Sequence, residues 1–224
     1  MTNIILSEKP WHTTLYKNLT DRCSGEWNLI QSKKDFISSN IRKMAPTYIF
    51  VPHWSYFIPP EIYENFECIV FHMTDLPYGR GGSPLQNLIK RGHQTTKISA
   101  FRCVKGCDAG DIYLKKDLTL DGSAEEIYKR ASYLIEDMIC EIVQNNPAPM
   151  EQSGEVVRFV RRTPQESLID EKFTLATLYD HIRMLDAPGY PLAFIERANL
   201  RYEFTHAKLE SGELCAKVRI KEII

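Results

Sequence analysis

The segment Cys68-Ile-Val-Phe-His-Met-Thr-Asp-Leu-Pro-Tyr-Gly-Arg-Gly-Gly-Ser-Pro-Leu-Gln86 joins a short apolar run to a glycine-rich loop. Similar runs occur at 4–6 and 48–51, and all three are rich in β-branched or aromatic residues. Such runs, separated by helical or turn-bearing segments, are typical of buried parallel strands in an α/β layer. His72 directly follows one of them, which places it at the carboxyl edge of the sheet, where open α/β sheets bind ligands.

The rest of the chain predicts a catalytic domain followed by a smaller one. A further strand is expected at 97–104, and helices are expected at 33–43, 85–91 and 174–185 and, after the capping box Ser123-Ala-Glu-Glu126, up to Asn145. Residues 145–156 are rich in proline, glycine and polar residues and predict a linker. Strands at 200–204, 207–209 and 214–220, with a hairpin turn at 210–213, follow it. We therefore expect one domain over 1–150, then a linker and a small, partly β domain over 151–224.

Composition is that of a compact globular protein. The chain has 224 residues, 43% of them hydrophobic and 25% charged, and its formal net charge is −1. This balance argues against a dominant electrostatic surface for nucleic acid. No apolar run approaches a membrane span, and the amino-terminal apolar stretch is too short for a secretory signal, so a cytoplasmic protein is expected. The six scattered cysteines indicate free thiols, and no metal site is expected.

A second motif supplies an acidic turn. Lys105-Gly-Cys-Asp-Ala-Gly-Asp111 follows the strand expected at 97–104 and has glycines on both sides of Asp108. A histidine and an aspartate at the ends of two neighbouring strands would lie within reach of each other, and the carboxylate could orient and charge the imidazole. From the residues alone, a structural histidine and a solvated Asx turn remain open.

These motifs resemble a known family. The stretch from His72 to Gln86 resembles, without a gap, the His-Pro-Ser-Leu-Leu-Pro-x-x-Arg-Gly-x-x-Pro-x-Gln loop of the 10-formyltetrahydrofolate-dependent formyltransferases. Gly106-Cys-Asp-Ala-Gly-Asp111 resembles that family's Gly-Leu-Asp-Thr-Gly-Asp turn. Stretches at 161–170, 181–185 and 189–194 resemble the segment that joins the two domains of methionyl-tRNA and sugar formyltransferases. The resemblance covers residues 47 to 195.

The resemblance implies a Rossmann-like, parallel-sheet formyltransferase domain, abbreviated at the N-terminus, with N10-formyltetrahydrofolate as co-substrate. In such enzymes an acceptor nitrogen attacks the formyl carbon, a histidine assists proton transfer and stabilises the developing oxyanion, and an aspartate tunes the histidine. Carried over, the catalytic residues are His72 and Asp108. The resemblance also implies a folate pocket with apolar walls, formed by Trp54, Ser55, Tyr56, Phe57, Ile58 and Val104.

One residue departs from the family pattern. The family has Asn-x-His, whereas this chain has Val70 two residues before His72. Valine removes a side-chain donor to the formyl oxygen, which in such sites is worth about 3 kcal/mol. Three residues are candidates to replace it: His53, Ser55 and Thr74. Lost or redirected chemistry is the other interpretation.

The acceptor is predicted from the charge balance and the short C-terminal region. Neither half of the chain is basic, although phosphate contacts dominate the binding of a polyanion. We therefore expect a small acceptor, a nucleotide-linked aminosugar of surface-glycan or lipopolysaccharide biosynthesis. No nucleic-acid or membrane partner is expected, and a homodimer is compatible with this interpretation. Substrate-binding residues would be Thr74, Tyr78 and Arg80. The alternatives are a methionyl-tRNA or other amine formyltransferase, a formyltetrahydrofolate hydrolase, and a catalytically impaired relative that binds folate or a nucleotide sugar.

Overall fold

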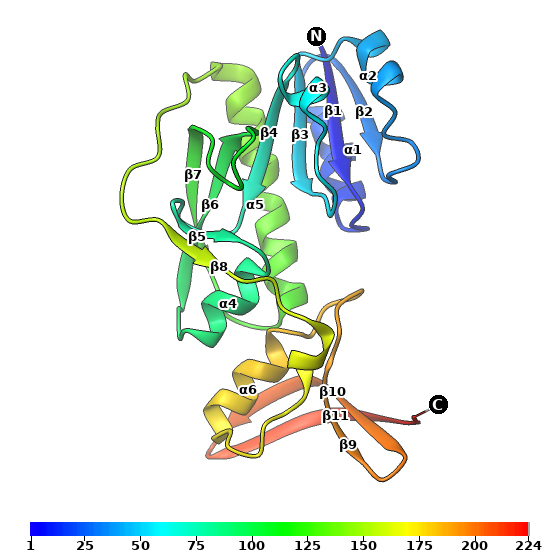
Figure 1. The fold of residues 1–224 in the computed structure, drawn as a ribbon, viewed down its shortest axis with the longest axis vertical. Coiled ribbons are helices and arrows are strands. Elements are labelled where there is room, and N and C mark those ends of the chain that lie inside the picture. The colour runs from blue at the N-terminus through cyan, green and yellow to red at the C-terminus, as the bar shows by residue number, and fades with distance from the viewer. Residues whose placement is uncertain (224) are drawn as a thin grey trace. The chain divides into compact units, whose positions relative to one another are not determined.

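The computed structural model describes residues 1–223 and contains a six-stranded sheet in the order β2-β1-β3-β4-β6-β7 (Figure 1). The strands β2, β1, β3 and β4 run parallel, which confirms the predicted α/β layer. Their bounds are β1 (Thr2–Ser7), β2 (Glu26–Ile30), β3 (Tyr48–His53) and β4 (Glu67–His72), followed by β6 (Thr95–Arg102) and β7 (Ile112–Thr119).

The strand β6 differs from its parallel neighbours because it runs antiparallel to β4. Val70 pairs with Phe101, and His72 pairs with Ser99. The apolar pattern predicts a strand in this region, but it does not determine the direction, because a strand buried on both faces has the same pattern either way.

The apolar runs form the core because both faces of the parallel strands are covered. All of residues 3–7 in β1 are buried, although successive side chains point to opposite faces. Ile4, Leu6, Ile49 and Val51 belong to one hydrophobic cluster. Truncation of such a residue to alanine typically costs about 2–5 kcal/mol of stability.

Six helices occur in the described chain: α1 (His12–Arg22), α2 (Ser38–Met44), α3 (Pro60–Tyr63), α4 (Pro84–Lys90), α5 (Ala124–Asn145) and α6 (Leu175–Arg183). The helix expected at 33–43 is wrong before Ser38. The Ser32 hydroxyl donates to the Asp35 carboxylate at 2.8 Å, and the Asp35 N–H donates to the Ser32 carbonyl at 3.1 Å, so a turn occupies that stretch. Local side-chain bonds of this kind compete with helix formation.

The C-terminal part contains a three-stranded antiparallel sheet, β9 (Ala193–Arg197), β10 (Leu200–Glu210) and β11 (Glu213–Glu222). Ser211 and Gly212 both have positive φ, as a tight two-residue hairpin requires, so the predicted turn is correct. The strands expected separately at 200–204 and 207–209 form one strand, β10, whose register shifts between Thr205 and Lys208. A bulge, and not a break, separates the two apolar runs.

The chain divides into two compact units, one made of residues 1–81, 97–118 and 129–158, the other of 82–96, 119–128 and residues from 159 onward. The boundary expected at residue 150 stays a prediction. The site residues discussed below all belong to the first unit. None of the helices within residues 1–223 is long and apolar enough to cross a membrane.

Candidate active site

His72 is the last residue of β4, and the strand that follows holds its ring. The short strand β5 (Tyr78–Gly81) brings the Gly79 carbonyl oxygen to 2.8 Å from His72 Nε2. A carbonyl oxygen only accepts, so Nε2 carries the proton in this bond. The residue is buried, with 9% of its surface exposed. Its orientation is therefore set by the backbone of its own loop.

Asp108 approaches the histidine from the turn between β6 and β7. Its Oδ2 lies 3.9 Å from His72 Nε2 and accepts the Gly81 N–H at 2.8 Å. Asp108 has φ +48°, and a Cβ added to Gly110 would lie 1.8 Å from the Arg102 carbonyl oxygen, so this turn requires glycine. The structure thus brings together the two residues that were predicted to act together.

The reason for their proximity differs from the prediction. Two parallel strands would end at the same edge, but β6 is antiparallel to β4, and Arg102 pairs with Ile69 near the start of β4. The turn after Arg102 spans the distance from that register position to His72. A long turn, and not a shared strand edge, therefore delivers the carboxylate.

Val70 lies on the same face of β4 as His72, because side chains two residues apart share a face. It is half-buried and packs against two apolar clusters, one around Ile49 and the other of Leu76, Phe101 and Ile112. This position therefore offers apolar contact beside the histidine and no hydrogen bond.

The three residues proposed to replace the missing amide occupy different environments. Thr74 is fully buried, and its Oγ1 has no hydrogen-bond partner within residues 1–223. His53, half-buried, ends β3 level with His72, since Val51 pairs with Val70 and both histidines lie two residues further on. Ser55 is exposed. Which of them approaches the formyl oxygen stays a prediction.

The residues expected to hold folate begin at the end of β3. Trp54 is half-buried, contacts Tyr56 edge-on at 5.4 Å between ring centroids, and has a buried Nε1 without a partner in the described chain. Phe57 is 98% exposed, whereas Ile58 is buried in the core cluster. Ser55 and Val104 are exposed. An exposed aromatic surface with one unpaired donor fits a flat heterocycle with polar edges.

The residues expected to bind the acceptor are less uniform. Thr74 is fully buried, and Tyr78 and Arg80 are half-buried. Arg80 donates from Nε and Nη2 to Gln152 Oε1, at 3.2 and 2.7 Å. Gln152 lies in the segment that the sequence indicated only as a linker, so it was missed; no motif marks it.

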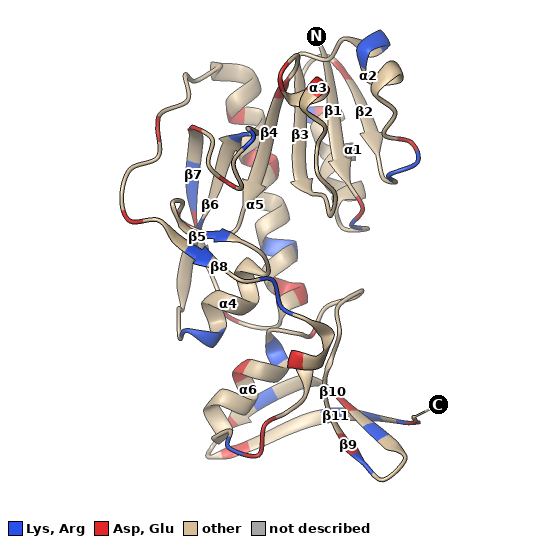
Figure 2. Cartoon of the chain, in the orientation of Figure 1, with Lys and Arg blue, Asp and Glu red and all other residues tan. Residues whose placement is uncertain are grey.

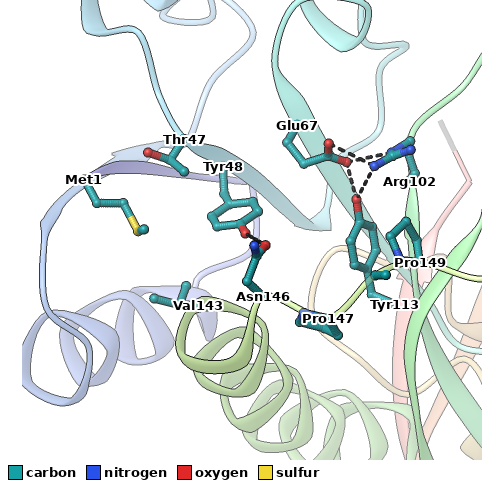
Figure 3. Close-up of a pocket in the computed structure, with 11 residues that line it drawn as sticks. Met1, Thr47, Tyr48, Glu67, Arg102, Tyr113, Val143, Asn146, Pro147 and Pro149 are labelled. Atoms are coloured by element: carbon teal, nitrogen blue, oxygen red, sulfur yellow. Dashed lines mark hydrogen bonds and ion pairs between the residues drawn. The ribbon is translucent and has the colours of Figure 1, made fainter.

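A cavity of about 540 Å³, shown in Figure 3, lies at the opposite end of these strands, where β3 and β4 begin. It is lined by Tyr48 and Glu67, the first residues of β3 and β4, whereas His53 and His72 end these strands. The polar groups around it bond to one another: Glu67 to Arg102 and Tyr113, and Tyr48 to Asn146. The cavity is therefore separate from the His72 site.

The cysteines are free thiols, and residues 1–223 contain no group of three His, Cys, Asp or Glu side chains placed to hold a metal ion. Burial, with the Asp108 charge adding to it, raises the pKa of Cys103 to about 11. Burial also raises the pKa of Cys140 to about 12. These two thiols therefore stay protonated at neutral pH.

Comparison with known proteins supports the interpretation of the motifs. A family described as "Formyl transferase" matches residues 16–143, and one described as "Methionyl-tRNA formyltransferase, C-terminal domain" matches residues 164–221. A solved structure described as methionyl-tRNA formyltransferase from Clostridium thermocellum is 47% identical, covers 99% of both chains and superposes with a TM-score of 0.96.

Two curated methionyl-tRNA formyltransferases match over shorter regions. That of Mesoplasma florum is 26% identical over 186 residues, which is 79% of this chain and 59% of the relative. That of Rickettsia massiliae is 30% identical over 132 residues, which is 56% of this chain and 44% of the relative. The chain thus spans about half the length of the curated relatives it matches.

The predicted acceptor is wrong. These similar proteins are described as methionyl-tRNA formyltransferases, which overturns the nucleotide-aminosugar acceptor, the surface-glycan and lipopolysaccharide pathway and the expectation of no nucleic-acid partner. That prediction rested on the charge balance of the two halves of the chain and on the short C-terminal region. Net charge is a sum over the chain, and it does not report where single lysines and arginines lie.

The family and the enzyme class were predicted correctly, as was the folate co-substrate that the family uses. A family match over residues 16–143 and a relative 47% identical over nearly the whole chain agree with the geometry of His72 and Asp108. On these grounds, the chain belongs to the formyl transferase family.

Proposed function

We propose that this protein transfers a formyl group from N10-formyltetrahydrofolate to the amino group of methionyl-tRNA. The observation that carries this proposal is the similarity to the Clostridium thermocellum methionyl-tRNA formyltransferase, at 47% identity over 99% of both chains. The His72–Asp108 arrangement supports the chemistry, because acyl transfer to an amine needs a proton acceptor and stabilisation of a developing oxyanion. The cytoplasm is the compartment in which we expect the reaction.

His72 would handle the proton. Its Nε2–H donates to the Gly79 carbonyl, so Nδ1 is the nitrogen that can accept a proton from the attacking amine. Protonation makes the ring an imidazolium, and the Asp108 carboxylate 3.9 Å away stabilises that charge. The proton would then pass to N10 of tetrahydrofolate, the leaving group, as the bond between N10 and the formyl carbon breaks. The Gly81 N–H holds the carboxylate in place at 2.8 Å.

The segment from Trp54 to Phe57 would hold the pterin. When bound, N10-formyltetrahydrofolate supplies the activated formyl group. Trp54 and Tyr56 offer ring surfaces, and the buried Trp54 Nε1 is a donor without a partner in the described chain. Because His53 and His72 end adjacent strands at the same level, this segment starts beside the catalytic histidine.

The C-terminal sheet would contact the tRNA. The family model for residues 164–221 is described as the C-terminal domain of methionyl-tRNA formyltransferase. Figure 2 shows lysine and arginine on β10 and β11 together with acidic residues. Three basic side chains on these strands, Lys208, Lys217 and Arg219, are candidates for phosphate contacts. Such contacts would make binding weaken as salt is added.

Formyl transfer can be tested directly. Purified protein is mixed with N10-formyltetrahydrofolate carrying a labelled formyl group, and with methionyl-tRNA, uncharged tRNA or free methionine. We expect acid-precipitable label only with methionyl-tRNA, and none with the His72→Ala variant. Labelled formate released equally with and without methionyl-tRNA would replace this proposal by a hydrolase. Folate binding without turnover on methionyl-tRNA would also overturn it.

A further inference from the structure

The side-chain amide of Gln152 forms hydrogen bonds through both its oxygen and its nitrogen, to strand β5 and to the Asp108 turn. Its Oε1 accepts from Arg80 Nε and Nη2, at 3.2 and 2.7 Å. Its Nε2 donates to the carbonyl oxygens of Asp108 and Gly110, at 2.9 and 2.7 Å. An amide has two donor hydrogens and two acceptor lone pairs. All four are used, so the side chain has a single orientation.

The backbone next to Gln152 is also fixed. Met150 forms an antiparallel bridge with Ile112, the first residue of β7, through N–H···O bonds of 2.7 and 2.9 Å. This bridge anchors the segment two residues before Gln152 against the strand that follows the Asp108 turn. The glutamine therefore reaches the turn from a rigid base.

These bonds complete a closed set of contacts around His72 and Asp108. Three consecutive residues of β5 each form a hydrogen bond to one of these side chains. Gly79 accepts from His72, Arg80 donates to Gln152, and Gly81 donates to Asp108. Gln152 Nε2 in turn donates to the backbone carbonyl of Asp108, which closes the set. Without it, β5 would still be joined to Asp108 by the Gly81 N–H bond to the carboxylate.

We propose that Gln152 is a positioning residue that clamps β5 to the Asp108 turn and so sets the distance between the carboxylate and the His72 ring. This inference rests on the proposed formyl transfer. Gln152 does not contact the reacting groups itself. Its effect on the reaction passes through Asp108, because its donors end on the carbonyls of that turn.

The two halves of the amide can be separated by substitution. Gln152→Glu keeps an acceptor for Arg80 but cannot donate, and it places a carboxylate less than 3 Å from two carbonyl oxygens. Gln152→Asn keeps both functions on a side chain shorter by one methylene. Gln152→Ala removes both. Gln31→Ala, at an exposed glutamine that bonds only weakly to Thr13 at 3.4 Å, is the matched control.

The kinetic experiment measures kcat and KM for each variant with methionyl-tRNA. A small misplacement of a catalytic group costs about 10- to 100-fold in rate. We expect a fall of this size in kcat for Gln152→Ala and a larger one for Gln152→Glu, with KM for the folate within twofold. In an Asp108→Asn background, Gln152→Ala should lower kcat by less than twofold. An equal fall in both backgrounds, or an unchanged kcat in the single variant, would overturn the proposal.

A second readout does not depend on turnover. The ring ¹⁵N signals of His72, assigned by comparison with His72→Ala, should move in Gln152→Ala and stay in place in Gln31→Ala, with the thermal midpoint of Gln152→Ala close to that of the parent protein. Unmoved His72 signals would refute the clamp even if formyl transfer is confirmed. Moved signals in a protein without formyl transfer would keep the clamp and remove the proposed reaction.

Discussion

The two ends of strand β4 carry polar clusters that differ in how their charges are paired. At its start, Glu67 accepts from Arg102 Nε at 2.8 Å and from the Tyr113 hydroxyl, and the cluster borders the cavity in Figure 3. At its end, His72 and Asp108 stay 3.9 Å apart, each held by a backbone group. One end has its charges joined directly, and the other keeps them close but short of contact.

This difference is the reason why we propose the His72 end for the chemistry. The Glu67 carboxylate already accepts three hydrogen bonds from a guanidinium and a phenol. Burial together with Glu67 raises the pKa of Tyr113. The carboxylate beside His72 is aimed at the ring by the Gly81 N–H and can strengthen its interaction when the ring becomes charged. The cavity accompanies the first arrangement, so cavity volume alone would point away from the proposed site.

The largest expected effect separates the two ends by activity. His72→Ala should lower kcat about 10²- to 10⁴-fold, the range of a lost general base, while the thermal midpoint stays within a few degrees. Glu67→Gln should leave kcat within twofold. Steady-state kinetics with methionyl-tRNA and thermal melts measure both. Comparable rate losses in the two variants would erase the distinction between the ends.

The next prediction concerns a buried histidine that should affect stability but not activity. His12 bonds to Ser7 Oγ at 2.6 Å, at the end of β1, and burial is the main cause that lowers its pKa to about 3. The unfolded chain binds this proton near pH 6.5 and the folded chain does not, so stability is complete above that pH and falls as pH decreases towards 3. The expected slope is about 1.4 kcal/mol per pH unit.

Urea unfolding between pH 4 and 7 measures this slope, and His12→Gln should reduce it. Burial also lowers the pKa of His181, which adds a slope of the same sign in both proteins and cancels in the comparison. An identical slope with and without the His12 imidazole would contradict the attribution of this pH dependence to His12.

A smaller effect is expected from adding a donor at the His72 end. Val70→Asn places an amide on the face of β4 that carries His72, where an oxyanion donor would act. We expect kcat to rise about tenfold, a fraction of what such donors contribute in other enzymes, with some loss of stability because Val70 packs against apolar clusters. A fall in kcat, measured alongside the thermal midpoint, would mean that the site is shaped around the valine.

The smallest expected effect belongs to the Glu67 end. Tyr113→Phe removes the hydroxyl that bonds to Glu67 and Arg102. Because the Glu67–Arg102 ion pair is partly exposed, we expect the free energy of unfolding to fall by about 1 kcal/mol. Activity should not change. Urea unfolding and kcat measure the two quantities. A rate loss beyond twofold would show that this cluster also supports the site.

Particular residues show how much could be predicted. His72 and Asp108 could be paired from their motifs, although the expected geometry assumed a shared strand edge and β6 runs the other way. Gln152 could not be found, because its partner Arg80 is 72 residues away and nothing in the linker marks it. The acceptor was mispredicted from the charge balance and the short C-terminal region, and a charge sum carries no information on where single charges lie.

The amino-acid sequence by itself determined the apolar strands, the tight turn at Ser211-Gly212 and the family motifs. These features depend on local burial, backbone sterics and contiguous residues, all of which a linear pattern records. Only the tertiary structure decided the direction of β6, the full set of bonds at Gln152 and the different pairing at the two ends of β4. Each of these depends on which distant groups meet, and a chain closes such contacts through the packing of the whole unit.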